Sequence, residues 1–269
     1  MIIVGGVEIK QGHFPDGTLL TKFDPNSDEF DPRGNMMVEW YYENDAELFT
    51  LICVKRHLDR AYSYSDVILY MPYIPHARQD RVKSDEDVFT LKYFCEVINS
   101  LKFKAVYVRD AHSNVSLALL DNVQDEGVAH YVRKAIDASG ADVLFFPDEG
   151  AMKRYSSTSE KPYAFGLKKR DWATGQIQGL NIVNVEAVVG KDVLIVDDIC
   201  SRGGTFYHSA KALKAAGAKS VSLYVTHLEK TVLDGDLCRE RLTEHVYTTK
   251  SIFPEAALEF WGDWITIVN

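Results

Sequence analysis

Short apolar runs of strand length recur along the chain, separated by segments that predict helices. Apolar runs bounded by polar or turn-forming residues are typical of buried β-strands. They occur at residues 1–10, 47–55, 65–75, 103–112, 141–150, 162–170, 192–198 and 219–227. The apolar tail at 260–269 is consistent with a further strand packed on another element.

Helices are predicted at 85–101, 127–140 and 205–216. In the first of these, apolar residues recur every three or four positions, as they do on one face of a helix. Those residues are Val88, Leu91, Phe94, Cys95 and Ile98. The other two helices each end at a glycine, Gly140 and Gly217, a residue that favours the backbone conformation of a helix C-terminus.

The alternation of strands and helices predicts an α/β protein with mostly parallel sheets covered by helices. The segment Asn122–Gly127 is the best candidate for a domain boundary, and the two halves resemble each other as α/β units. In such sheets function collects at the carboxyl ends of the strands. Several predicted strands end in charged residues, so we expect the functional residues to lie at these strand ends.

Composition narrows the class of protein. The formal net charge of −9 argues against a nucleic-acid surface, which carries a basic stripe. The four cysteines lack the spacing of a zinc site and indicate free thiols in a reducing cytosol. The N-terminus lacks the regions of a signal peptide, and no apolar run approaches the roughly 18 residues of a membrane span. We therefore expect a cytoplasmic protein with neither a membrane nor a nucleic-acid partner.

Two adjacent acids end one of the most apolar predicted strands. Asp197 and Asp198 follow the run VLIV, and at the end of a strand both carboxylates can reach a ligand. Two carboxylates suit the vicinal hydroxyls of a ribose. The loop Ser201–Thr205 then offers backbone N–H groups, glycines and a helix N-terminus, which together bind phosphate. This pattern indicates a pentose phosphate site; the alternative is an acidic turn with Thr205 as helix cap.

Two further segments carry cations. The loop after the strand at 65–75 contains Arg78, Gln79, Asp80 and Arg81. Its arginines suit phosphate oxygens because the guanidinium group is planar and permanently charged, although a solvated charged loop is the simpler interpretation. In the strand at 162–170, Lys168 and Arg170 share one face, and two such cations suit a developing phosphoryl charge.

Three isolated residues are weaker candidates. Phe14 begins the string FPDG, where it could stack on a base, but such a string is also an ordinary turn. His112 could contact a metal or phosphate, or be structural. Asp148 could bind Mg²⁺ through water, with Glu149 as a competing candidate.

Taken together these segments resemble the ribose-phosphate diphosphokinase family, the synthetases of 5-phosphoribosyl 1-diphosphate. The motifs follow in the family's order along nearly the whole chain: FPDG, ARQDR, D-x-H, PD-x-G, K-x-R, VDDI…GGT and V-x-TH. The ARQDR string is the specific part, whereas VDDI…GGT is shared with the wider type I phosphoribosyltransferases.

The resemblance implies an α/β fold of two type I phosphoribosyltransferase-like domains, with ATP on the side of residues 1–127 and the ribose phosphate on the side of 128–269. It implies transfer of the diphosphoryl group of ATP to the anomeric hydroxyl of ribose 5-phosphate, giving 5-phosphoribosyl 1-diphosphate and AMP. It also implies Mg²⁺, a place in nucleotide biosynthesis, and a homo-oligomer that is a dimer or a hexamer built from dimers.

The resemblance also assigns roles to residues by motif. Phe14 and Asp16 would hold the adenine, from a neighbouring subunit. Arg78, Gln79, Asp80 and Arg81 would line the ATP site. His112 and Asp148 would serve Mg²⁺ and the triphosphate, and His112, Lys168 and Arg170 would take part in catalysis. Asp197 and Asp198 would bind the ribose hydroxyls, and Ser201, Arg202, Gly203, Gly204 and Thr205 the 5-phosphate.

The phosphate loop departs from the family's usual D-T-A-G-T, because Ser201 replaces an acid and Arg202 a threonine. This makes the loop more favourable to anions and keeps open an acceptor with more than one phosphate, such as ADP-ribose, in NAD-related metabolism. A phosphoribosyltransferase is less favoured because it would not need ARQDR or K-x-R. A non-catalytic regulatory relative is less favoured because the cationic and metal-site residues remain.

Overall fold

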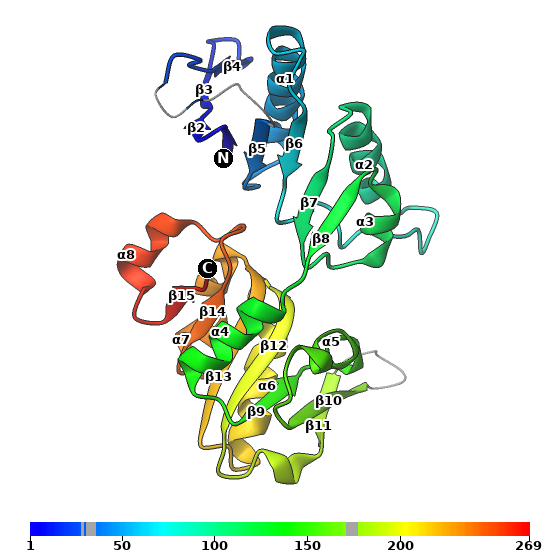
Figure 1. The fold of residues 1–269 in the computed structure, drawn as a ribbon. Coiled ribbons are helices and arrows are strands. Elements are labelled where there is room, and N and C mark those ends of the chain that lie inside the picture. Colours follow the sequence, from blue (N-terminus) through cyan, green and yellow to red (C-terminus); the bar gives the residue numbers. More distant parts are fainter. Residues whose placement is uncertain (28–29, 31–35, 171–176) are drawn as a thin grey trace. The chain divides into compact units, whose positions relative to one another are not determined.

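A computed structural model describes residues 1–27, 30, 36–170 and 177–269. The chain folds into two units, Met1–Glu126 and Gly127–Asn269, each with its own sheet and hydrophobic core (Figure 1). In the part of the chain that is described, no helix is long and apolar enough to cross a membrane.

The first unit is built on a sheet in the order β2-β1-β5-β6-β7-β8. Its strands are β1 Ile2–Val4, β2 Val7–Glu8, β5 Met36–Trp40, β6 Val67–Tyr70, β7 Val106–Arg109 and β8 Val123–Glu126. Strands β5 to β8 are parallel, and β1 is antiparallel to both of its neighbours. The helices are α1 Ala46–Ala61, α2 Thr90–Ser100 and α3 Asn114–Leu119, and β3 Lys10–His13 and β4 Leu19–Lys22 form a separate hairpin.

The second unit is built on a sheet in the order β11-β10-β9-β12-β13-β14-β15. Its strands are β9 Val143–Phe146, β10 Tyr163–Arg170, β11 Ile177–Val183, β12 Asp192–Cys200, β13 Ser220–Leu228, β14 Val246–Thr248 and β15 Ile265–Ile267. Every pairing is parallel except that of β10 with β11. The helices are α4 Ala129–Ser139, α5 Glu149–Tyr155, α6 Gly204–Ala215, α7 Asp236–Arg239 and α8 Leu258–Trp261.

Both faces of the second sheet are covered, which explains why its central strands are continuous apolar runs. In β12, Val193 and Ile195 belong to one core cluster, which also contains α6 residues such as Phe206. The alternate residues Leu194 and Val196 belong to the other cluster, together with side chains of α4 and α5. Strand β12 is therefore buried between two layers of helix.

The prediction of a strand at 47–55 is wrong, because these residues form part of α1. The buried positions of the helix are Glu47, Thr50, Leu51, Val54, Lys55 and Leu58, which recur every three or four residues. The run FTLICV is rich in residues that favour strands, and this short window hides the helical period. Burial of one helix face decided the local structure against strand propensity.

Most of the other predicted elements are confirmed, with shifted ends. Helices α2, α4 and α6 lie within or next to the predicted ranges, and Gly140 and Gly217 have the left-handed backbone expected of helix ends, with φ of 65° and 92°. The tail contains β15, which pairs with β14. The segment Asn122–Gly127 contains strand β8, and its last residue is the first residue of the second unit.

Candidate active site

The two adjacent acids lie inside β12, which continues past them to Cys200 and stays paired with β13 as far as Leu228. Since side chains alternate along a strand, Asp198 is in phase with Val196 on the face covered by α4 and α5, and Asp197 is on the face covered by α6. Asp198 is only 7% exposed. Its backbone N–H donates to Asp197 Oδ1 at 2.9 Å, so the two residues also contact each other directly.

A residue that the sequence did not single out contacts this acidic pair. Arg154 Nη1 donates to Asp198 Oδ2 at 3.2 Å from the last turn of α5. The same helix begins at Asp148, whose Oδ1 accepts from the backbone N–H of Ala151 at 3.1 Å as the helix N-cap. The available signal was the basic pair Lys153 and Arg154, five and six residues after Asp148, at the end of a short helix. Sequence spacing alone does not show that it meets Asp198.

The loop after β12 leads into α6 through a glycine with a left-handed backbone. Gly203 has φ of 81° and is the N-cap of α6, so the alternative that made Thr205 the cap is wrong. Non-glycine residues rarely adopt this conformation, and a Cβ on Gly203 would also lie 3.0 Å from Leu237 Cβ. The side chain of Arg202 is exposed, while Ser201 Oγ lies 3.2 Å from Thr231 Oγ1. The loop thus presents polar groups and the start of a 12-residue helix to solvent.

Gly235, in the segment after β13, fixes the path of this loop. A Cβ added to Gly235 would lie 1.9 Å from the carbonyl oxygen of Arg202, which no real side chain tolerates. The backbone of the loop therefore rests directly on the backbone at Gly235. This support was not visible from the motifs.

The structure brings together two motifs of the first unit. Asp80 accepts a forked pair of bonds from Arg81, at 2.6 Å to Nε and 2.8 Å to Nη2. It also accepts from Ser113 Oγ at 2.7 Å, next to His112 and at the N-cap of α3. Asp80 therefore connects the ARQDR loop to the D-x-H loop and fixes the direction of the Arg81 guanidinium.

The pKa of the Asp80 carboxyl is held far below its usual value. The hydrogen bond from Arg81 is the main cause, with further contributions from Ser113 and from the positive field of His112; burial opposes them. Because the ionised form is favoured, Asp80 stays an acceptor for Arg81 across the physiological pH range. Arg78 and Gln79, earlier in the loop, have exposed side chains.

The FPDG string forms the turn of the β3–β4 hairpin. Gly17 has φ of 83°, and the Phe14 side chain is 50% exposed, which leaves an aromatic face open to stacking. Asp16 Oδ1 accepts from the Thr18 N–H at 3.0 Å and from Thr18 Oγ1 at 2.6 Å. Both bonds lower the pKa of Asp16, and the bond from the Thr18 side chain has the larger effect.

Of the predicted metal and catalytic residues, the structure describes His112 and Asp148 but not the side chains of Lys168 and Arg170. His112 belongs to the first unit and Asp148 to the second. Among residues 1–27, 30, 36–170 and 177–269 there is no group of three or more His, Cys, Asp or Glu side chains that could hold a metal by itself. A site for Mg²⁺ carried on substrate phosphates needs only one or two carboxylates, and Asp148 is a carboxylate. The backbone of β10 includes Lys168 and Arg170, but their side chains lie outside what the structure describes.

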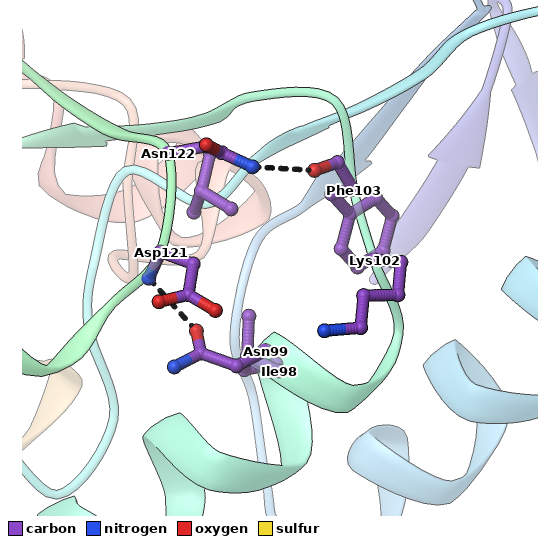
Figure 2. A pocket seen from close by; sticks show the side chains of 7 residues that line it. Ile98, Asn99, Lys102, Phe103, Asp121 and Asn122 are labelled. Atoms are coloured by element: carbon purple, nitrogen blue, oxygen red, sulfur yellow. Dashed lines mark hydrogen bonds between the residues drawn. The ribbon is translucent and has the colours of Figure 1, made fainter.

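Figure 2 shows a cavity of about 210 Å³ in the first unit that is separate from these motifs. It lies at the amino ends of β7 and β8, the edge of the sheet opposite to Arg109 and Asp110. The side-chain amides of Asn99 and Asn122 hydrogen-bond to nearby backbone, at 2.9 Å to Asp121 N and 3.3 Å to Phe103 O. These amides stabilise the local chain, so this cavity is not part of the candidate active site.

A domain family and a solved structure of known proteins match this fold. The phosphoribosyl transferase domain family matches residues 151–262. The crystal structure of phosphoribosylpyrophosphate synthetase from Mycobacterium smegmatis superposes with a TM-score of 0.73 at 21% identity, covering 97% of this chain and 85% of that one. The fold thus defines a protein of the type I phosphoribosyltransferase-like class, with two such domains.

Sequence relatives give the family. The chain is 30% identical over 228 residues to ribose-phosphate pyrophosphokinase of Brucella melitensis, covering 81% of this chain and 71% of that protein. It is 29% identical over 230 residues to the enzyme of the same name from Thermococcus kodakarensis, covering 82% and 77%. The chain belongs to the ribose-phosphate pyrophosphokinase family of enzymes. The family and the fold class predicted from the motifs are confirmed.

The support that Gly235 gives to the loop can be tested by adding one methyl group. Gly235→Ala should destabilise the protein by about 1–3 kcal/mol, a typical cost of overpacking, because the Arg202 carbonyl must move away. Gly127→Ala is the control, since a Cβ there meets no atom within 4 Å. Thermal and urea unfolding of both variants provide the measurement. Equal stability of Gly235→Ala and wild type would contradict the described loop path.

Proposed function

We propose that the protein transfers the diphosphoryl group of ATP to the anomeric hydroxyl of ribose 5-phosphate, giving 5-phosphoribosyl 1-diphosphate and AMP. The observation that carries this proposal is the acidic pair of β12 followed directly by the glycine-containing loop and the N-terminus of α6. The chain's membership of the ribose-phosphate pyrophosphokinase family gives independent support.

The acceptor would lie along the carboxyl end of β12. The ribose 2- and 3-hydroxyls donate to the carboxylates of Asp197 and Asp198, and the 5-phosphate accepts from backbone N–H groups of residues 201–205. The start of α6 adds the partial positive charge of a helix N-terminus. The diol and the phosphate are thereby both bound, which fixes the orientation of the ring and of the anomeric hydroxyl on C1.

The nucleotide would be held by residues of the ARQDR loop and the FPDG hairpin. Arg78 and Gln79 have exposed side chains that suit the triphosphate, and the Asp80–Ser113 bond keeps Arg81 in one orientation. Phe14 would stack on the adenine, with Asp16 beside it, in the site of a neighbouring subunit of a homo-oligomer. The exposed ring of Phe14 supports that role, because an aromatic face of this size gains by covering a base.

The chemistry places little covalent work on the protein. The anomeric hydroxyl releases its proton to solvent, and its oxygen bonds to the β-phosphorus in line. The bond from that phosphorus to the α–β bridging oxygen breaks, and AMP leaves with the bridging oxygen. Lys168 and Arg170 would neutralise the charge that develops on the transferring group, with His112 near the triphosphate. Mg²⁺, for which Asp148 and His112 are the proposed ligands, supplies further charge neutralisation when bound.

A second candidate has the same chemistry with a longer acceptor. The exposed Arg202 side chain and the uncharged Ser201 make the loop attractive to more than one phosphate group. An acceptor such as ADP-ribose would place its second phosphate near Arg202 and would connect the reaction to NAD-related metabolism. The exposure of Arg202 is the specific observation in favour of this candidate.

The proposed reaction has a direct test. Purified protein with Mg-ATP and ribose 5-phosphate should release AMP and 5-phosphoribosyl 1-diphosphate in equal amounts. Both products can be quantified by anion-exchange chromatography. Asp197→Asn, which keeps the side-chain shape, should lose most of this activity. ADP as the nucleotide product, or no nucleotide product with any ribose phosphate acceptor, would contradict the proposal.

The role of the β10 cations can be separated from substrate binding. Lys168→Ala should lower kcat by roughly 10²–10³-fold, as expected when one group that stabilises the transition-state charge is lost, with a smaller effect on KM. Lys169→Ala, at the intervening position of the strand, is the matched control and should keep most of the activity. An unchanged kcat in Lys168→Ala would remove Lys168 from the mechanism.

A comparison of two acceptors and a substitution of Arg202 test which acceptor the protein uses. If the acceptor carries more than one phosphate, ADP-ribose should support faster AMP release than ribose 5-phosphate at equal low concentration. Arg202→Ala should then raise KM for ADP-ribose by about tenfold or more, the effect of losing a charged hydrogen bond, and change KM for ribose 5-phosphate less. No reaction with ADP-ribose would exclude this second candidate.

A further inference from the structure

We propose that Arg154 is the positioning residue for the acceptor sugar, acting through Asp198. This inference rests on the proposed function, because it assigns Arg154 to the same diol site. The contact that carries it is the bond from Arg154 Nη1 to Asp198 Oδ2, at 3.2 Å between two residues that are 44 positions apart in the chain. Arg154 is not among the residues that the motifs assign to the site.

Asp198 needs a cation in its surroundings. Its side chain is 10% exposed, and the neighbouring residue Asp197 is a second carboxylate. A carboxylate that is largely removed from water and lies beside a like charge is costly to keep ionised unless a donor pairs with it. Arg154 provides that partner from the face covered by α5. It holds one oxygen of Asp198 in place and thereby sets the direction of the carboxylate at the strand end.

The position of Arg154 is itself fixed by its helix. Tyr155, the next residue, is fully buried in the core, and the guanidinium of Arg154 lies 6.0 Å from the centroid of its ring. The arginine is in the last turn of α5, where a cation also interacts favourably with the helix C-terminus. Asp148 caps the other end of the same seven-residue helix. Helix α5 therefore joins the proposed metal ligand at its start to the proposed sugar ligand through Arg154 at its end.

Loss of a residue that acts in this way should weaken binding of the acceptor and leave binding of the nucleotide unchanged. In Arg154→Gln, KM for ribose 5-phosphate should rise by about 10- to 100-fold, the range for losing a hydrogen bond to a charged group, while KM for ATP stays within about twofold. Arg154→Lys keeps the charge and should give a smaller rise, and it provides the same comparison if the glutamine variant folds poorly. Arg133→Gln, an exposed arginine on α4, is the matched control and should behave like wild type.

A double-mutant cycle separates a positioning role from a general structural one. In an Asp198→Asn background, Arg154→Gln should cause little further rise in KM for ribose 5-phosphate, because its partner is already neutral. Additive effects, equal changes in both KM values, or an unchanged KM for ribose 5-phosphate in Arg154→Gln would overturn the inference. These outcomes require an active wild-type enzyme; a wild-type protein that releases no AMP from ATP with any ribose phosphate would overturn the proposed function instead.

Discussion

The structure of the candidate site depends on one constraint: a largely buried carboxylate within a parallel strand must be paired. Strand β12 is covered on both faces, and even its last residue, Cys200, is buried in the core. Asp198 lies two residues before the end of β12, with Asp197 beside it and Arg154 bonded to it. The pair is thus held by the fold before any ligand arrives, which is the condition for discriminating a sugar by its hydroxyls.

The first unit uses the same arrangement with different residues. Asp80 follows β6 by ten residues and accepts from Arg81 and from Ser113, which caps the helix after β7. In both units a carboxylate is bonded to an arginine and connected to the N-cap of a short helix, although Asp80 follows its strand and Asp198 lies within β12. In the first unit the carboxylate orients an arginine, which suits a triphosphate; in the second the arginine orients a carboxylate, which suits a diol. We interpret this difference as the division of the two proposed ligands between the units.

The sequence predicted the parts of this arrangement that are local. Continuous apolar runs identified strands such as β9 and β12, because a strand buried on both faces has no polar alternation. The acidic pair and the glycine loop were recognisable as consecutive residues. Helix α1 was misread because its central residues favour strands and only the full helix shows the period of its buried face. The Arg154–Asp198 and Ser113–Asp80 bonds join residues 44 and 33 positions apart, and no local pattern carries that information.

The measurement that tests the central claim most directly is a structure of the protein crystallised with ribose 5-phosphate and solved by X-ray diffraction. The account predicts the sugar at the carboxyl end of β12, with its 2- and 3-hydroxyl oxygens about 2.6–3.0 Å from carboxylate oxygens of Asp197 and Asp198. It also predicts the phosphate against the backbone of residues 201–205, with the Arg154–Asp198 bond retained. A sugar phosphate bound elsewhere in the crystal, with no sugar hydroxyl within hydrogen-bond distance of the acidic pair, would contradict it.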